Sequence, residues 1–573
     1  MTAPSSSRGA APWLEGAILA TLVGTVLVMG GEAVRASYHG YLHTTIGQTV
    51  LRDGLLPENP YHAGNGLRYY TLYPTLGALL GRLGAGPIWG FAWLNILSAL
   101  LFAPASDAFA RASGLTFSQR RATFLTAVLG FNALGWVGWM VASHSPEIQV
   151  PVFALESMSW GGHAWAWDAR LQSFLPKFLN VSSFALALPF MLWAMAPAMA
   201  REGRAVQILA PLGVALAINP LAGGFAVLCI AMWQWRSLFH QDWRQKLAWP
   251  FAGVLAGLCA LPFLLPLFQS APSAQSLTGT VRFQHDGLMN FFGPMALLLV
   301  PGFLGIWQWK SGERNRLLFA LVLAIFITAF ATMPWGNQYK LARISGLLWA
   351  IPVGRWLGLQ WEKAGKRRWL PVAFIGLSLP SLVLVVQAYL SWGGVAQAAP
   401  LVSGQGTLQL RQDLKFSAFP PSILEAESSA PADAVLWMHP NHVGARASNG
   451  VVQGNALTPL FSHSLFVDLP QIHNNQIADL EQRIQLCGKF WQPSFTNADG
   501  KIQPANPQQA ELMAAAALRD AQAILPQRSL LVLTYISTPW TATVLENAGA
   551  SKLASESELS LWLVPGSVNG AGN

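Results

Sequence analysis

Histidine, acidic and tyrosine side chains cluster in the stretch after the first long apolar segment. A carboxylate or a neutral imidazole in such a stretch can act as a general base. Tyrosine hydroxyls and a guanidinium can bind an anionic group. The candidates here are Glu32, His39, His43, Asp53, Arg68, Tyr69 and Tyr70.

Two later stretches add charged candidates. Asp168, Arg170 and Lys177 lie in the second long polar loop, and Tyr339, Lys340 and Arg343 stand where a late apolar segment begins. Ionisable side chains near membrane depth suggest function, although cations at helix ends also extend toward the surface. Asp168 and Arg170 could equally form a simple ion pair.

Metal chemistry has weaker support. His39 and His43 are spaced i, i+4, which on a helix would place both imidazoles on one face and permit two metal ligands. The sequence offers no clear third ligand, so no metal site is assigned and a divalent metal stays an open alternative. The three cysteines show no metal-binding spacing.

The elements that position these residues are membrane spans. The 573 residues are 53% hydrophobic and only 11% charged, against roughly 25% charged in soluble domains. A span needs about 20 apolar residues. Eleven candidates follow: 14–31, 86–110, 121–143, 181–200, 205–219, 221–236, 247–268, 291–309, 316–333, 341–357 and 368–392.

Basic residues fall on alternate loops, at 111–121, 201–204, 236–246, 310–316 and 355–368. The positive-inside rule places these loops in the cytoplasm. Loops 32–69 and 144–180 then face outward together with the C-terminal tail. The segment 70–84 is too short to cross comfortably, and a twelfth span there would change this parity.

Membrane topology therefore explains the excess of basic residues in the chain, and nucleic-acid binding is not needed to explain it. The expected location is the plasma (inner) membrane, with a multi-pass domain at 1–392. The first span is expected to serve as an uncleaved signal anchor. A soluble extracytoplasmic domain is expected at 393–573.

The tail alternates strand and helix patterns, which predicts an α/β domain. The expected strands are 434–439, 529–536 and 559–564, and the expected helices are 476–487, 508–525 and 540–548. The tail contains no phosphate loop, nucleophile elbow or metal spacing. It is therefore expected to act as a lid or docking module.

The phrases Gly-Leu-Leu-Pro-Glu-Asn-Pro (54–60) and Tyr-Tyr-Thr-Leu-Tyr-Pro (69–74) follow an outward loop that begins with Glu32. This combination resembles the polytopic GT-C superfamily of membrane glycosyltransferases, especially bacterial members of undefined acceptor. The resemblance extends loosely over about residues 1–360. It implies an α-helical membrane bundle with an outward C-terminal domain.

The resemblance also implies transfer of a sugar from a polyprenyl-phosphate donor to a glycan, lipid or protein acceptor on the outer face. Glu32 or His39 would be the base, with Asp168 as a further catalytic candidate. Arg68, Arg170 or Lys340 would lie near the lipid phosphate, and membrane lipids would surround the helices.

One departure keeps alternatives open. Relatives often carry a second acidic residue soon after the first, whereas Glu32 is followed here by Ala33, Val34 and Arg35. A transporter or flippase of a lipid-linked or small solute is the runner-up, but no inverted repeat supports it. The third hypothesis is a non-catalytic subunit whose tail recruits partners. Convergence of Glu32, His39, Asp168 and Lys340 on one outward cavity would favour an enzyme.

Overall fold

A computed structural model describes the helical and sheet regions of the chain. The described residues are 7–36, 39–84, 86–129, 174–200, 204–235, 243–268, 280–281, 298–309, 312–332, 339–363, 365–377, 379, 420–439, 445–446, 452–453, 460–467, 479–496 and 502–566. They form two compact units. The first comprises 1–40, 70–264 and 276–410, and the second comprises 41–69, 265–275 and 411–573.

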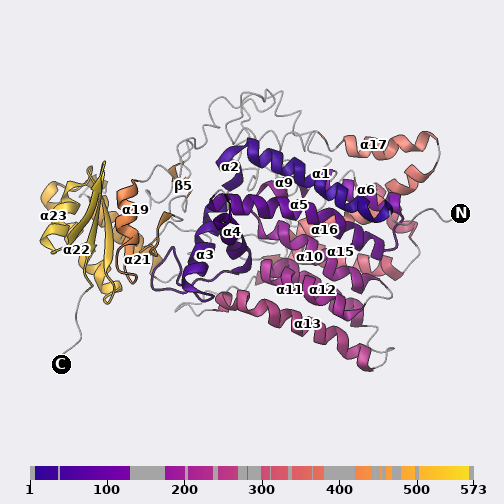
Figure 1. Ribbon diagram of the computed structural model, residues 1–573, viewed down its shortest axis with the longest axis horizontal. Helices are drawn as coiled ribbons and strands as arrows, with labels where there is room; N and C mark the ends of the chain where they lie inside the picture. The colour runs from indigo at the N-terminus through magenta and orange to yellow at the C-terminus, as the bar shows by residue number, and fades with distance from the viewer. Residues whose placement is uncertain are drawn as a thin grey trace. The chain divides into compact units, whose positions relative to one another are not determined.

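The first unit is a helical bundle (Figure 1). Its longer helices are α1 (Ser7–Met29), α5 (Pro87–Ala112), α6 (Phe117–Leu129), α10 (Ser183–Met199), α11 (Leu209–Ile218), α12 (Pro220–Trp235), α13 (Trp243–Leu264), α15 (Gly312–Phe330) and α16 (Tyr339–Glu362). Shorter elements are α2 (Gly31–Ala36), α4 (Leu72–Arg82), α9 (Phe174–Leu179), α17 (Trp369–Gly376) and the 3₁₀ turns η3 (Ala205–Ile208) and η7 (Lys366–Arg368). A two-residue ladder joins β1 (Thr280–Val281) to β2 (Ala331–Thr332).

Helix α10 lies inside this bundle, because nearly all of its side chains are buried and it packs against α5, α11 and α12. Helices α1 and α13 instead expose apolar side chains such as Leu22 and Phe251, as lipid-facing helices do. Within the described residues, three helices are long and apolar enough to cross a membrane, Ala10–Met29, Ile88–Ala112 and Leu247–Phe268.

Four shorter apolar helices accompany them, and the expected spans at 121–143 and 368–392 run on into residues outside the described ranges. Helix α4 has 11 residues, which corresponds to about 16 Å at 1.5 Å per residue. It is therefore too short to cross about 30 Å of hydrocarbon. The Asn219-Pro220 pair predicts a tight turn between two spans, and α11 does end and α12 begin at this point.

A buried ion cluster joins three helices where the bundle is rich in basic residues. Asp107 of α5 is buried and accepts from Arg120 Nε at 2.8 Å and from Arg121, both on α6. Arg121 also donates to Glu15 of α1. Two cations that were expected to lie in a basic cytoplasmic loop are therefore helical residues that neutralise the buried carboxylate of Asp107 and the partly exposed one of Glu15.

The pair α6 and α16 packs through two glycines spaced four residues apart. A Cβ atom added to Gly354 would come closer than 3.0 Å to Thr123, and one added to Gly358 would meet Gln119 in the same way. Small residues at this spacing let helix backbones approach closely in a membrane.

The second unit contains a four-stranded sheet of order β3-β8-β10-β9. The strands are β3 (Val435–Trp437), β8 (Leu530–Tyr535), β9 (Ser551–Glu556) and β10 (Leu559–Val564). Strand β3 runs parallel to β8, and the other pairs are antiparallel. Three of these strands lie where the sequence pattern predicts them. The pattern missed β9, because this edge strand is mostly exposed and polar.

Helices cover both faces of the sheet. Val532 of β8 packs with α21 (Leu480–Trp491), α22 (Pro507–Ile524) and α23 (Pro539–Asn547), whereas Leu531 and Leu533 pack with α19 (Pro421–Ser428). Burial on both faces explains why β8 is apolar throughout. Small two-stranded ladders pair β4 (Ala445–Arg446) with β5 (Val452–Gln453), and β6 (Ser494–Thr496) with β7 (Ile502–Pro504).

Most of the first long loop, 32–69, belongs to this second unit. This part of the loop begins with α3 (Gly40–Asp53). The residues after α3 pair with the tail through backbone hydrogen bonds. Ala63 N donates to Leu465 O and Leu465 N donates to Pro60 O, both at 2.8 Å. Since loop and tail share these bonds, they lie on the same side of a membrane. The number of crossings between them is therefore even, as in the eleven-span prediction.

We expect Gly354→Val to destabilise the bundle, because the added side chain forces α6 and α16 apart. Overpacking of this kind typically costs about 1–3 kcal/mol. The measurement is the thermal unfolding midpoint of the full chain in detergent. Gly257→Val in α13 is the matched control, since nothing lies within 4 Å of an added Cβ there. Equal midpoints for the two variants would contradict a close glycine contact.

Candidate active site

Three of the residues singled out in the sequence converge in the helical bundle. His39 lies in the turn between α2 and α3, Lys177 lies on α9, and Lys340 lies in the first turn of α16. The charges of both lysines act on the imidazole of His39. These residues are separated by more than 130 positions in the sequence, so the bundle and not local spacing brings them together.

A third cation lies on the same helix as Lys340. Arg343 is three residues further along α16, which places both side chains on one face. Its side chain is fully buried, and Lys177 is 6% exposed. Burial of this much positive charge requires nearby negative or polar groups.

The electrostatic environment of His39 follows from this placement. Burial lowers the pKa of His39 to about 3, and the positive charges of Lys177 and Lys340 act in the same direction. The imidazole is therefore neutral at pH 7, and one ring nitrogen can accept a proton or a hydrogen bond. A bound anion would offset the two lysines and raise this pKa.

Local packing fixes the backbone at this position. Gly40 packs closely, and a Cβ atom there would lie 3.2 Å from Ala36 Cβ and 3.5 Å from Val181 Cγ2. Tyr73 of α4 is fully buried, and its hydroxyl accepts from Ser182 N at 3.0 Å. The turn that holds His39 and the segment after Lys177 are thus held by neighbouring elements of the bundle.

A polar network lies at the start of α10. The Tyr70 hydroxyl is 2.7 Å from Ser183 Oγ, and the Asn219 amide donates to the same oxygen at 3.0 Å. The sequence indicated only a turn at Asn219. Its hydrogen bond to Ser183 is a tertiary contact between α10 and the α11–α12 turn. The only signal for Asn219 in the sequence is the proline that follows it.

Tyrosines that precede an apolar segment, as those at 69–73 do, are typical of an aromatic belt at the membrane surface, and the sequence alone predicts such a belt here. This prediction is wrong for Tyr73, because its ring is fully buried and lies 5.6 Å from that of Phe91. A neighbouring helix, not lipid, covers it.

Several predicted site residues fall outside what the structure describes. Asp168 and Arg170 lie outside the described ranges, so the proposed convergence of Asp168 with the other residues stays a prediction. Glu32 lies on α2 and Tyr339 opens α16, but their side chains are outside the described set.

Four further candidates belong to the second unit. Asp53 ends α3 and forms an ion pair with Arg52 at 2.6 Å. His43 is buried, with its ring 5.6 Å from that of Tyr69 in an edge-to-face arrangement. Arg68 is half-buried in the same segment. His43 and Tyr69 thus contribute to packing in this unit.

The predicted helical pairing of His39 with His43 is not observed, because His39 precedes α3 and His43 lies within it. Among the residues that the structure describes, no three His, Cys, Asp or Glu side chains cluster closely enough to hold a metal ion.

A charged network that the sequence did not reveal joins the first loop to the tail. Arg483 is 2% exposed, donates to the carbonyls of Ala63 and Phe466, and pairs with Asp479 at 2.8 Å. Asp479 also lies 3.3 Å from His62 Nε2. Burial alone would raise the pKa of Asp479, but the hydrogen bond from His62 and the charge of Arg483 hold it below its usual value.

The protonation state of His62 follows from its other neighbour. The Asn65 amide nitrogen lies 2.8 Å from His62 Nδ1 and can only donate, so the proton of the neutral ring sits on Nε2, facing Asp479. Burial lowers the pKa of His62, and the charge of Arg483 acts in the same direction against the effect of Asp479.

Elsewhere in the tail, Cys487 is a structural residue. The Trp437 indole donates to its sulfur at 3.2 Å, and burial raises the pKa of the thiol to about 12. The rings of Trp437, Phe490 and Trp491 surround this position. A thiol with so high a pKa is unreactive at neutral pH, so the tail's cysteine serves packing.

Solved structures with the same architecture are membrane glycosyltransferases. The arabinofuranosyltransferase AftD from Mycobacteria has a TM-score of 0.54 at 14% identity over 96% of this chain. Its R1389S mutant has a TM-score of 0.56 at 14% identity over 97%. This chain spans 40% and 42% of those two chains.

ArnT from Cupriavidus metallidurans bound to undecaprenyl phosphate has a TM-score of 0.45 at 12% identity, covering 96% of this chain and 99% of that one. No family model matches the sequence, and no curated protein does. ArnT and AftD are GT-C glycosyltransferases, and the likeness to AftD confirms the expected resemblance at the level of fold.

His62, Asp479 and Arg483 form a joint between the first loop and the tail. We expect low pH to reduce the stability of this joint. The folded-state pKa of His62 is below the unfolded value of about 6.5, so the unfolded chain binds more protons below that pH. Stability is therefore highest above about pH 6.5 and falls as the pH drops toward the folded-state pKa. Hydrogen exchange of segment 58–66 in the full chain, corrected for intrinsic rates, measures this loss.

His62→Gln should flatten that pH dependence, because glutamine cannot take up the proton. His463→Gln is a control, since this histidine lies in the same unit but bonds to Glu427 and Pro431. If His62→Gln and wild type show the same pH dependence of hydrogen exchange, His62 is not the group whose protonation destabilises the joint.

Proposed function

We propose that this protein is a membrane glycosyltransferase that moves a sugar from a polyprenyl-phosphate donor to an acceptor on the outer face of the membrane. The observation that carries the proposal is the convergence of Lys177 and Lys340 on His39 within a helical membrane bundle. A phosphate that remains attached to a membrane lipid needs cations beside apolar helices, and this region supplies both.

The fold supports the same conclusion. AftD, whose architecture the chain shares, is by name a transferase of arabinofuranose. That likeness concerns fold only, so donor, acceptor and sugar for this chain rest on its own residues. The buried cations Lys177 and Arg343 give the donor-phosphate hypothesis its chemical basis.

The proposed reaction needs no bound metal. The acceptor hydroxyl oxygen attacks the anomeric carbon, while the bond from that carbon to the phosphate oxygen breaks and the phosphate takes the electron pair. Lys177, Lys340 and Arg343 stabilise the charge that develops on the departing phosphate. Arg68 and Arg170 are further candidates for this role.

The acceptor proton requires a base. Glu32, on α2 just before the His39 turn, is the proposed base. A neutral His39 is proposed to accept or donate a hydrogen bond at the phosphate, since its pKa of about 3 makes it a weak base in the empty site. Asp168 stays a second acidic candidate, and Tyr70 and Tyr339 are proposed to contact substrate.

The proposed location is the inner membrane, with the tail and the first loop outside. Their shared backbone hydrogen bonds support a common side. The alternating basic loops support placing that side away from the cytoplasm. The tail is proposed to act as a lid or docking module for the acceptor.

A transporter is less well supported. A transport path needs charged groups within the membrane that can exchange partners. Asp107, which is buried in a spanning helix, is instead neutralised by Arg120 and Arg121. This carboxylate holds helices together and is not available to a moving solute.

The test is sugar transfer in proteoliposomes supplied with polyprenyl-phosphate sugars. We expect Lys177→Ala and Lys340→Ala to reduce kcat by about 100-fold, the usual cost of removing one group that stabilises a developing anion. Lys340→Arg should retain more activity because it keeps the charge. Glu32→Gln should abolish transfer, whereas His39→Gln should retain part of it.

Lys363→Ala is the matched control, because Lys363 follows the other end of α16 and is exposed. It should leave transfer unchanged. Equal activity of Lys340→Ala and Lys363→Ala would refute the phosphate role. Absence of transfer by wild type from every donor would favour the non-catalytic subunit.

A further inference from the structure

The turn between α16 and α17 concentrates basic residues. Four of the six residues from 363 to 368 are lysine or arginine. They follow the expected span 341–357, at the membrane surface that the sequence predicts for the basic loops. Glu362 is the only acidic residue between 341 and 376, and its carboxylate accepts from the hydroxyls of Thr116 and Ser118. The turn therefore carries a net positive charge, which the proposed reaction does not use.

Several cations elsewhere in the bundle have partners within the chain. Arg120 and Arg121 bond to carboxylates, and Arg316 donates to carbonyls at the end of α10. Arg367 and Arg368 of η7 are instead exposed, and neither forms an ion pair with a carboxylate among the residues that the structure describes. These two guanidinium groups are therefore accessible to an anion from outside the chain.

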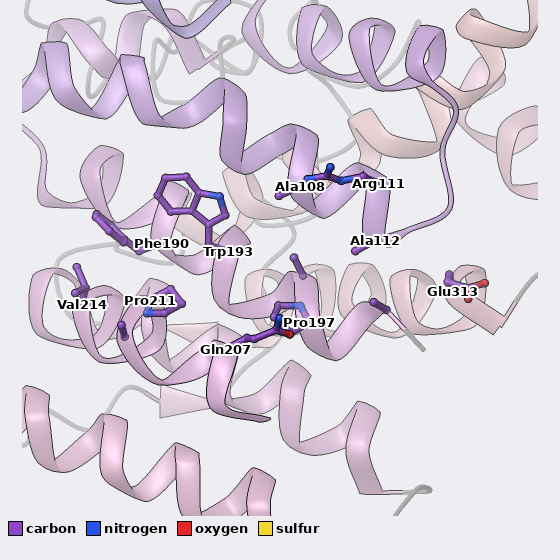
Figure 2. A pocket seen from close by; sticks show the side chains of 13 residues that line it. Ala108, Arg111, Ala112, Phe190, Trp193, Pro197, Gln207, Pro211, Val214 and Glu313 are labelled. Carbon is purple, nitrogen blue, oxygen red and sulfur yellow. The ribbon is translucent and has the colours of Figure 1, made fainter. Parts of the chain in front are cut away.

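Another basic helix end differs in its charge balance. Arg111, in the last turn of α5, lines a cavity of about 930 Å³ among α5, α10, α11 and α15 (Figure 2). Glu313 of α15 lines the same cavity, as do the apolar side chains of Phe190 and Trp193. Acidic and basic groups thus occur together at that helix end, whereas basic groups predominate at the α16–α17 turn.

A glycine and two ring contacts fix the geometry of the turn. Gly365 has a φ of 95°, in the left-handed region that favours glycine, and its carbonyl accepts from Arg368 N at 3.3 Å. Helix α17 packs back against α16, where the rings of Trp356 and Phe374 meet edge-to-face at 5.9 Å. The guanidinium of Arg368 lies 5.8 Å from the ring centre of Trp361. This cation–π contact positions Arg368 and leaves its N–H groups available for hydrogen bonds.

Exposed indoles flank the same cation. Trp361, in the last turn of α16, is 48% exposed, and Trp369, the first residue of α17, is 61% exposed. Exposed indoles beside apolar helices favour the boundary between hydrocarbon and water. Since Arg368 precedes Trp369 and contacts Trp361, its charge lies at the level of the lipid head groups.

From these features we propose that the α16–α17 turn binds the head group of an anionic phospholipid of the phosphatidylglycerol class. Arg367 and Arg368 bind its phosphate, and the two exposed indoles hold the turn at head-group level. A zwitterionic head group would bring an ammonium group to a surface that already has an excess of positive charge, so the anionic lipid is favoured. The site is separate from sugar transfer and does not depend on it.

The test is native mass spectrometry of the full-length protein in detergent, titrated with phosphatidylglycerol or phosphatidylcholine of identical chains. We expect phosphatidylglycerol to bind about tenfold more tightly, because each cation near the surface strengthens attraction to an anionic lipid. The double variant Arg367→Gln/Arg368→Gln should remove this preference. Arg367→Lys/Arg368→Lys should keep most of it, because both charges remain.

Arg111→Gln/Arg204→Gln is the matched control, because it removes two exposed cations from other helix ends. It should keep the wild-type preference. An equal loss of preference in both double glutamine variants would indicate general charge attraction and overturn the proposed site. Equal binding of the two lipids by wild type would also overturn it. So would displacement of phosphatidylglycerol by soluble glycerol phosphate at equal concentration, since the ligand would then be a soluble anion.

Discussion

Positive charge held inside an apolar helical bundle is the constraint on which the proposed chemistry depends. Lys177 and Arg343 are buried, and Lys340 acts with Lys177 on one imidazole. Such a concentration of cations costs desolvation energy, which nearby polar or negative groups must offset. Burial keeps His39 neutral, and the charges of the two lysines act in the same direction.

The bundle holds these groups with small residues and paired charges. Glycines on α16 let α6 approach closely, and Asp107 ties α5 to α6 through two arginines. Neither device takes part in the proposed reaction. The glycine contact fixes α16, which carries Lys340 and Arg343 near its start. In lipid, close packing of backbones and pairing of charges hold helices together in place of the hydrophobic effect that stabilises a soluble core.

The tail is a different kind of structure, a sheet with helices on both faces. Its link to the first loop gives it a defined relation to the membrane topology, since Arg483 bonds to the carbonyl of Ala63 across 420 positions of sequence. A module joined in this way cannot be on the opposite side of the membrane from that loop.

The sequence by itself determined the membrane bundle, the short segment at 70–84 and most of the strands and helices of the tail. These follow from apolar run length and from residue periodicity, which are local properties. It also singled out His39, Lys177 and Lys340 by residue type and position near helix ends. The sequence pattern did not predict strand β9, because an exposed edge strand has no alternating apolar residues.

Only the tertiary structure decided which of these residues meet. It placed His43 in a packed core and brought His39 to the two lysines. It also built the joint of His62, Asp479 and Arg483. Contacts between residues hundreds of positions apart depend on how helices pack and how the chain returns, and no local pattern in the sequence encodes that.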